Sequence, residues 1–169
     1  NNIINFNQNK EWSFLKVNYL LLSKDKQIVK SKIYSKISSD NSESDVKIVS
    51  IIWNDWNIDL DGIIEIDKWF VKIKWNLIEE NLFLWNTWKV RWIPTLLVRS
   101  DDVEASHACK IERISDDKLF YLRSRWISKD NALNLIIESN IKSVFWWISF
   151  IDNDFYEILF EKTLRKINQ

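Results

Sequence analysis

The sequence is poor in glycine, proline, cysteine and histidine. Its 169 residues include one of each, and no methionine. A single cysteine excludes an internal disulfide, and the first residues lack the basic and apolar segments of a secretion signal. We therefore expect a cytoplasmic protein. At this length the chain corresponds to one domain, large enough to bury a sizeable core.

An excess of charge of either sign is also missing. Lys plus Arg and Asp plus Glu each number 24, so no net field attracts nucleic acid or an anionic membrane. The longest uncharged apolar stretch, Ser143–Ile151, is far shorter than the roughly 20 residues that a membrane-spanning helix needs. We therefore expect neither a nucleic-acid partner nor a membrane span.

Tryptophan, in contrast, is abundant, with 11 residues against one glycine. The two types together make up about 7% of the chain, which is the ordinary share of glycine alone. Tryptophans also stand where glycine is favoured. Trp126 follows a predicted helix end, where a left-handed residue is common. Two turn-like pairs are also flanked by tryptophan: Trp53 and Trp56 flank Asn54-Asp55, and Trp85 and Trp88 flank Asn86-Thr87. Our hypothesis is that the gene uses UGA for glycine and that this codon was translated as tryptophan. The alternative is a genuinely Trp-rich protein, for example one with an aromatic ligand-stacking surface.

From about Gln27 to Arg99 apolar residues recur with a period of two. Val29 and Ile33 share one face of the first run, whereas Lys30 and Lys32 share the other, as in a half-buried strand. Further short strands are predicted at Val46–Ile52, Ile58–Ile66, Phe70–Leu77, Asn81–Leu84, Lys89–Ile93 and Thr95–Arg99. The polar segment Ser38–Asp45 predicts a mobile loop or a subdomain boundary. The spacing fits a sandwich, a barrel or a β-solenoid, and periodicity alone does not choose among them.

After Ile114 the pattern becomes helical. Ser115 and Ser128 are favourable N-caps and predict helices over 116–125 and about 129–142; a third is predicted over Asn153–Ile167. The predicted apolar faces comprise Ala132, Leu135, Ile136 and Ser139 in the second helix, and Phe155, Ile158, Leu159 and Thr163 in the third. The chain thus divides into a strand region over 1–114, least defined over 1–45, and a helical cap over 115–169.

The densest motif lies in Asp101–Ala132, DDVEASHACKIERISDDKLFYLRSRWISKDNA, which places the only His and the only Cys two residues apart. It resembles the late core and C-terminal segment of the SufB/SufD family, scaffold subunits of an iron–sulfur cluster assembly machine. The SufD side of that family reads D-V-x-x-S-H, about a dozen residues, L-F-Y-L-x-S-R-G-I, and then a helix. The matching residues occur here without a gap: Asp102, Val103, Ser106, His107, Leu119, Phe120, Tyr121, Leu122, Ser124, Arg125 and Ile127. Upstream, Ile93-Pro94 with Leu96 and Val98 is similar to the segment by which the family enters this strand.

This resemblance to SufD-like members implies a mainly β fold, a right-handed parallel β-helix followed by a small C-terminal helical cap. It implies a scaffold without catalytic turnover of its own. The partners would be a SufB-like subunit, or a second copy, at the β-helix edge, and a SufC-like ATPase at residues 115–169. An iron–sulfur cluster would be held transiently, and no cofactor permanently. The chain is shorter than ordinary members, so a fragment and a reduced subunit both remain open.

His107 is the best candidate for chemistry, because a neutral imidazole ligates iron and the resemblance places this His at the subunit interface where a cluster is built. If residues 103–111 are extended, Cys109 lies on the same face and its thiolate could reach the same iron. The family's implicated cysteine belongs to the SufB-like partner, so a buried Cys109 that packs as a small apolar group is the competing interpretation. Glu104 and Glu112 could add oxygen ligands, although solvated strand-edge charges are favoured.

Two other functions stay open. One is a structural β-helix protein that keeps the partner interface without cluster chemistry. Ala108 and Glu112 stand where the resemblance implies glycine, so we expect the local backbone to differ there from the family type. The other is a β-helix enzyme acting on polysaccharides, which would use carboxylates on consecutive coils. We expect the carboxylates that raise this question to lie on the solvated outer face instead: Asp55, Asp59, Asp61, Glu65 and Asp67.

Overall fold

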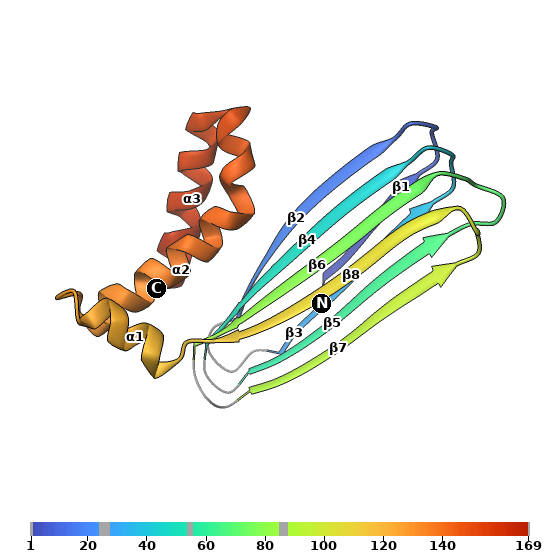
Figure 1. Ribbon diagram of the computed structural model, residues 1–169. Helices are drawn as coiled ribbons and strands as arrows, with labels where there is room; N and C mark the ends of the chain where they lie inside the picture. Colours follow the sequence, from blue (N-terminus) through green and yellow to red (C-terminus); the bar gives the residue numbers. More distant parts are fainter. Residues whose placement is uncertain (1, 24–27, 54–55, 85–87, 169) are drawn as a thin grey trace.

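The computed structural model describes residues 2–23, 28–53, 56–84 and 88–168. Along these residues a run of strands is followed by helices (Figure 1). The strands are β1 (Asn2–Gln8), β2 (Phe14–Ser23), β3 (Ile28–Ile37), β4 (Glu43–Ile52), β5 (Trp56–Ile66), β6 (Ile73–Phe83), β7 (Trp88–Val98) and β8 (Val103–Arg113). The helices are α1 (Asp116–Arg123), α2 (Lys129–Phe145), the 3-10 helix η1 (Trp146–Phe150) and α3 (Asn153–Asn168).

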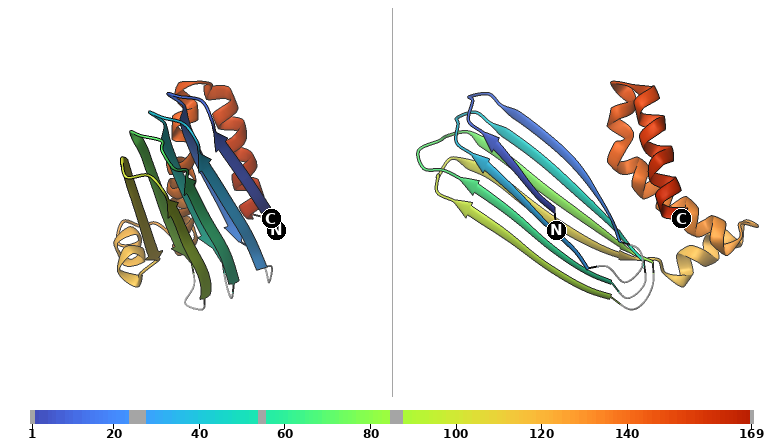
Figure 2. Two further views of the ribbon diagram at one scale, coloured as in Figure 1. Left: turned by 90° about the vertical axis from the view of Figure 1, so that its right-hand side faces the viewer. Right: turned by 180° about the vertical axis from the view of Figure 1, so that it is seen from behind.

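The strands form two parallel sheets, each taking every second strand of the chain. One sheet has the order β1-β3-β5-β7 and the other β2-β4-β6-β8, and all six pairings are parallel. Phe14, Glu43, Lys74 and Glu104 stand in register, so each coil takes about 30 residues. The two sheets face each other (Figure 2). The fold is therefore a parallel β-solenoid of about three turns with helices at its C-terminal end, which confirms the predicted fold class.

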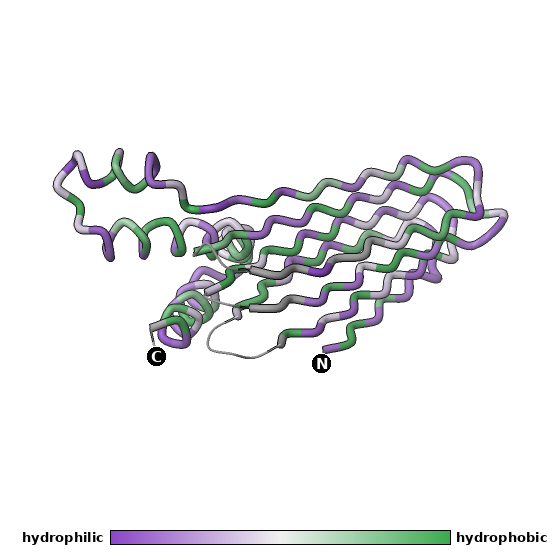
Figure 3. Tube along the Cα trace, turned by 90° about the horizontal axis from the view of Figure 1, so that it is seen from below, coloured by the Kyte–Doolittle hydropathy of each residue, from purple (hydrophilic) through white to green (hydrophobic). Residues whose placement is uncertain are grey.

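The solenoid interior is filled by every second residue of each strand. Ile64 and Ile66 are buried whereas Glu65 lies on the outer face, as the alternation predicts. Figure 3 shows this alternation along the strands. The enclosed core comprises Leu21, Ile33, Ile37, Val46, Ile48, Ile52, Leu60, Ile64, Ile66, Ile73, Trp75, Leu77 and Phe83. The inward side chains of successive coils stand in register and thus form one continuous apolar column.

Several strands are longer than predicted. The separate predictions Phe70–Leu77 and Asn81–Leu84 merge into β6, and Lys89–Ile93 and Thr95–Arg99 merge into β7. In the sequence, Glu79 and Glu80 interrupt the apolar pattern of β6, and Pro94, which lacks an N–H, falls inside β7. Among the described residues β7 is the edge strand of its sheet, the place where a proline is most readily accommodated within a strand.

The loop predicted at Ser38–Asp45 is shorter in the structure, which has a turn over 38–42 and strand from Glu43 onward. β4 already begins at Glu43, and the remaining residues form a tight turn between β3 and β4. Ser39 and Ser42 are buried in this turn and bond to each other, with 2.8 Å between their Oγ atoms. Ser38 is half-buried, and its Oγ donates a hydrogen bond to Asp67 Oδ2 at 2.9 Å. Part of the polarity of this segment therefore serves hydrogen bonds within the solenoid corner.

The helices begin and end close to the predicted residues. Ser115 Oγ accepts a hydrogen bond from the Lys118 N–H, and Ser128 Oγ accepts one from the Asn131 N–H, so both predicted N-caps are confirmed. The predicted apolar faces were partly wrong. In α2 the buried residues are Ala132, Ile137, Ile141 and Val144, and in α3 they are Phe160, Thr163 and Ile167. Leu135, Phe155 and Ile158 instead face solvent, since α2 and α3 each turn a different stripe toward the core.

These helices cover part of the outer face of the β2-β4-β6-β8 sheet. Ile137, Ile141 and Val144 of α2 pack in one cluster with Val49 and Ile51 of β4. The outer face of β4 is therefore apolar only in its second half, where both faces of the strand are buried. No helix among the described residues is both long and apolar enough to cross a membrane.

Backbone conformation bears on the tryptophan hypothesis. Among the described residues, five that are not glycine have positive φ: Trp12, Asn41, Trp69, Lys72 and Trp126. Trp126, with φ 65°, occupies the left-handed position predicted beyond α1. The turns predicted at Asn54-Asp55 and Asn86-Thr87 lie outside the described residues.

Candidate functional site

β8 forms the C-terminal edge of its sheet. It pairs with β6 on one side, and all its residues except Val103 and Glu112 are exposed. β7 ends the other sheet at the same end of the solenoid, with Leu96, Leu97 and Val98 exposed (Figure 1). An edge strand presents unpaired backbone N–H and C=O groups to any strand that approaches. The last coil is therefore an open pairing surface within the part of the chain that the structure describes.

His107 lies on β8 with its side chain on the inner phase, directly over Leu77 of β6. Because no further described coil stacks on it, the side chain keeps 25% of its exposure. Its Nε2 is 3.6 Å from Oε2 of Glu79. Burial lowers the pKa of His107, which favours the neutral ring, the form that ligates metal.

Cys109 shares this face two residues on, over Glu79, as predicted for an extended strand. The residue is exposed, so the interpretation as a buried packing residue was wrong. The Asn81 Nδ2 donates a hydrogen bond to its Sγ at 3.8 Å. Although the residue as a whole is exposed, partial desolvation of its sulfur and then the nearby Glu79 carboxylate raise the pKa of Cys109, whereas the bond from Asn81 lowers it. The thiol is thus favoured over the thiolate that binds iron.

Glu79 completes this group, and the sequence analysis missed it. Its side chain is 1% exposed, inside the solenoid and one coil below Cys109. In β6 it stands in phase with Ile73, Trp75, Leu77 and Phe83, which are all buried. Counting by two from Leu77 would have placed this carboxylate inside, which is the signal that could have found it.

Glu104 and Glu112 lie on the opposite face of β8. Glu104 pairs with Lys74 at 3.3 Å, and Glu112 pairs with Lys110 at 2.7 Å and with Lys118 of α1. These two glutamates therefore point away from His107, as solvated charges of the strand. The ion pairs lower the pKa of Glu112.

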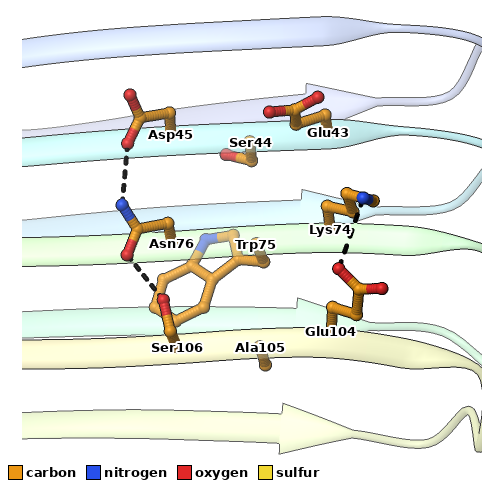
Figure 4. A pocket seen from close by; sticks show the side chains of 9 residues that line it. All are labelled: Glu43, Ser44, Asp45, Lys74, Trp75, Asn76, Glu104, Ala105 and Ser106. Carbon is orange, nitrogen blue, oxygen red and sulfur yellow. Dashed lines mark hydrogen bonds and ion pairs between the residues drawn. The ribbon is translucent and has the colours of Figure 1, made fainter.

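A polar ladder on the outer face holds β8 in register. Ser106 Oγ donates to Asn76 Oδ1 at 2.6 Å, and Asn76 Nδ2 donates to Asp45 Oδ1 at 3.0 Å. These side chains line a shallow groove across β4, β6 and β8 (Figure 4). Successive side chains of a strand point to opposite faces. Because Ser106 is held on the outer face by this ladder, the next side chain, His107, points inward.

No group of three or more His, Cys, Asp or Glu side chains stands ready to hold a metal ion among residues 2–23, 28–53, 56–84 and 88–168. Three carboxylates of the polysaccharide alternative, Asp59, Glu65 and Asp67, pair with basic residues instead. Asp59 lies near Lys30 and Arg91, and Glu65 and Asp67 lie near Lys36 and Arg99. Asp55 lies outside the described residues. A metal ion at His107 would therefore need further ligands from outside the described residues.

The sequence was compared with known proteins. The family model described as SUF system FeS cluster assembly, SufBD core domain, matches residues 1–140. The chain belongs to this family. It is similar to the iron–sulfur cluster assembly protein SufD of Escherichia coli, with 26% identity over 129 residues, covering 76% of the chain and 30% of that protein.

Other SufBD relatives show the same partial coverage. A SufBD family protein of Staphylococcus haemolyticus is 29% identical over 97 residues, covering 57% of the chain and 21% of that protein. One from Mycobacterium leprae is 38% identical over 61 residues, covering 36% of the chain and 16% of that protein. The chain thus spans less than a third of the length of these relatives. Membership of the SufBD family confirms the resemblance carried by the DVEASH and LFYLRSR motifs.

Proposed function

We propose that the chain acts as a SufD-like scaffold subunit in iron–sulfur cluster assembly, where it holds a nascent cluster transiently and catalyses no turnover itself. The observation that carries this proposal is the position of His107. It lies on the open edge strand of the last coil, reaches solvent, and is favoured in the metal-ligating neutral form. A partner that pairs with this edge would place its own ligands beside the imidazole.

The partner at this edge would be a SufB-like subunit, or a second copy of the chain. The exposed apolar residues of β7 and Ile111 of β8, 55% exposed, provide surface for such a partner to bury. The opposite edge, β1 and β2, also lacks a second neighbour among the described residues, and there Phe14 is 62% exposed. His107 distinguishes the C-terminal edge from this one.

The helical segment 115–169 would dock a SufC-like ATPase. Phe150, Ile151, Phe155 and Ile158 are each more than half exposed and lie on η1, α3 and the turn between them. Apolar residues clustered on a surface commonly mark a protein partner site. A second exposed pair, Phe120 and Tyr121, belongs to the LFYL motif on α1.

The test is anaerobic co-expression with SufB-like and SufC-like subunits, followed by pull-down and analysis of iron and sulfide. We expect a complex that contains both elements, and a His107→Ala complex that assembles but holds much less of them. Ile111→Glu should abolish pairing, because it places a charge in the edge. Phe14→Glu, with similar exposure at the other edge, is the matched control and should pair normally.

The outcomes separate the alternatives. A complex that forms but keeps its iron and sulfide after His107→Ala would favour the structural β-helix protein without cluster chemistry. Failure of the wild-type chain to form any complex would contradict the scaffold proposal. Localisation in a cytoplasmic fraction, which this function requires, is measured on the same cells.

A further inference from the structure

We infer that Glu79 is a second iron-binding residue of the His107 site, an inference that rests on the proposed function. Glu79 Oε2 and His107 Nε2 are 3.6 Å apart. Two donors each about 2.1 Å from one metal ion stand about 3.0–3.6 Å apart for bond angles of about 90–120°. One ferrous ion can therefore touch both atoms with little movement of either side chain.

The surroundings of Glu79 favour a functional role for its charge. A carboxylate inside an apolar solenoid is stabilised by a positive charge beside it, which a bound cation would supply. One coil earlier, Ile48 holds the equivalent position and packs in the core, so the fold itself requires no acid there. Gly62, the only glycine of the chain, lies next to Glu79 in the interior. A Cβ added at Gly62 would stand 3.5 Å from Glu79 Oε1, in ordinary van der Waals contact.

The pair forms half of a coordination sphere. Imidazole and carboxylate are both good ligands of ferrous iron, and the remaining positions would open toward the β8 edge, where a partner or sulfide can supply donors. Glu79 suits this role better than Cys109, whose sulfur accepts the bond from Asn81. The half-site consists of one residue from each of the last two coils.

The experiment is equilibrium binding of ferrous ion, under anaerobic conditions, to the co-purified complex. We expect Glu79→Gln and His107→Ala each to weaken binding at least about 10-fold, as loss of a metal-site residue commonly does. The double variant should be less than additive, because both residues hold one ion. Glu80→Gln is the control, because Glu80 lies on the outer face beside Lys47 and should bind as the wild type does.

Each outcome decides between the proposals. If Glu79→Gln binds iron normally while His107→Ala does not, the assignment of Glu79 is overturned and the proposed function stands. If neither change matters, both are overturned. Glu79→Gln keeps the size of the side chain and opens no cavity, so we expect a thermal midpoint close to that of the wild type. Iron loss together with a lower midpoint would mark Glu79 as structural and also overturn the assignment.

Independently, the backbone geometry points to glycine as the native residue at Trp12, Trp69 and Trp126. These have φ of 62°, 74° and 65°, a region that glycine enters freely and other residues rarely. Trp12 and Asn41 occupy equivalent places in successive coils, so this corner repeatedly needs a left-handed residue. The three indoles are 75%, 90% and 99% exposed, so no packing compensates the backbone strain.

The alternative of an aromatic binding surface fits these positions poorly. Trp12 and Trp69 lie in turns at the opposite end of the solenoid from α1, which Trp126 follows (Figure 1). They cannot form one stacking platform. Two further tryptophans, Trp75 and Trp147, bury an indole N–H without a hydrogen-bond partner among the described residues. Buried indoles usually find one. Glycine at Trp12, Trp69 and Trp126 would remove the backbone strain, and at Trp75 and Trp147 it would remove the indole N–H that lacks a partner.

Peptide mass spectrometry of the protein from its native source decides the matter. We expect glycine in the peptides that cover the three positions; tryptophan at any of them overturns the inference. In the expressed chain, Trp12→Gly, Trp69→Gly and Trp126→Gly should each raise the thermal midpoint by about 2–4 °C. Asn41→Gly should change it little, because Asn tolerates this conformation. Lower midpoints in all three variants would contradict the strain argument.

Discussion

At the scale of single residues, the site depends on which phase of a strand each side chain takes. His107 and Cys109 share the inner phase of β8, and Glu79 shares it one coil below. Glu104 and Glu112 take the outer phase and pair with lysines. Residues separated by an odd number of positions in β8 thus belong to different surfaces, one over the solenoid interior and the other on its outer face.

For Cys109 we expect little contribution to iron binding. Its thiol has a raised pKa, so little thiolate exists at neutral pH, and Cys109→Ser should leave the iron content of the complex almost unchanged. Because the residue is exposed, the free energy of unfolding should change by less than about 0.5 kcal/mol. Iron analysis and denaturant titration measure both quantities, and a loss of iron as large as that of His107→Ala would show that the sulfur is a ligand.

At the scale of elements, α1 is joined to the edge strand through Glu112. Lys110 of β8 and Lys118 of α1 both pair with this carboxylate and lower its pKa. Since its pKa in the folded chain lies below the ordinary value of about 4.5, Glu112 stabilises the fold above that pH. The contribution is lost as the pH falls through the folded-state pKa.

Glu112→Gln should therefore destabilise the α1 contact by about 0.5 kcal/mol at neutral pH and have almost no effect near pH 3. Hydrogen exchange of the α1 amides at both pH values measures this difference. Glu104→Gln is the control, because Glu104 is 77% exposed and pairs within the sheet, away from α1. A pH-independent effect of Glu112→Gln would contradict the role of its charge.

At the scale of the whole molecule, the solenoid and the helices have separate cores. The residues of the enclosed core all come from strands, whereas α2 and α3 pack on the outer face. Deletion of Asn153–Gln169 should leave the parallel sheets folded, as judged by circular dichroism, and abolish binding of the ATPase subunit. The double substitution Phe150→Ser and Ile158→Ser should abolish binding too without removing a helix, because both side chains are exposed. Retained binding in both variants would refute the docking surface.

Much of this protein follows from the sequence alone. Period-two runs gave the strands, Ser115 and Ser128 gave the helix starts, and the DVEASH and LFYLRSR motifs gave the family, because each depends on neighbours close along the chain. The same local patterns gave incomplete predictions at two places. Pro94 lies inside an edge strand, and Ser38–Asp45 form a tight turn followed by the start of β4. Only the tertiary structure brought Glu79 to His107. The register between β6 and β8 joins residues of different coils, and no local periodicity encodes that register.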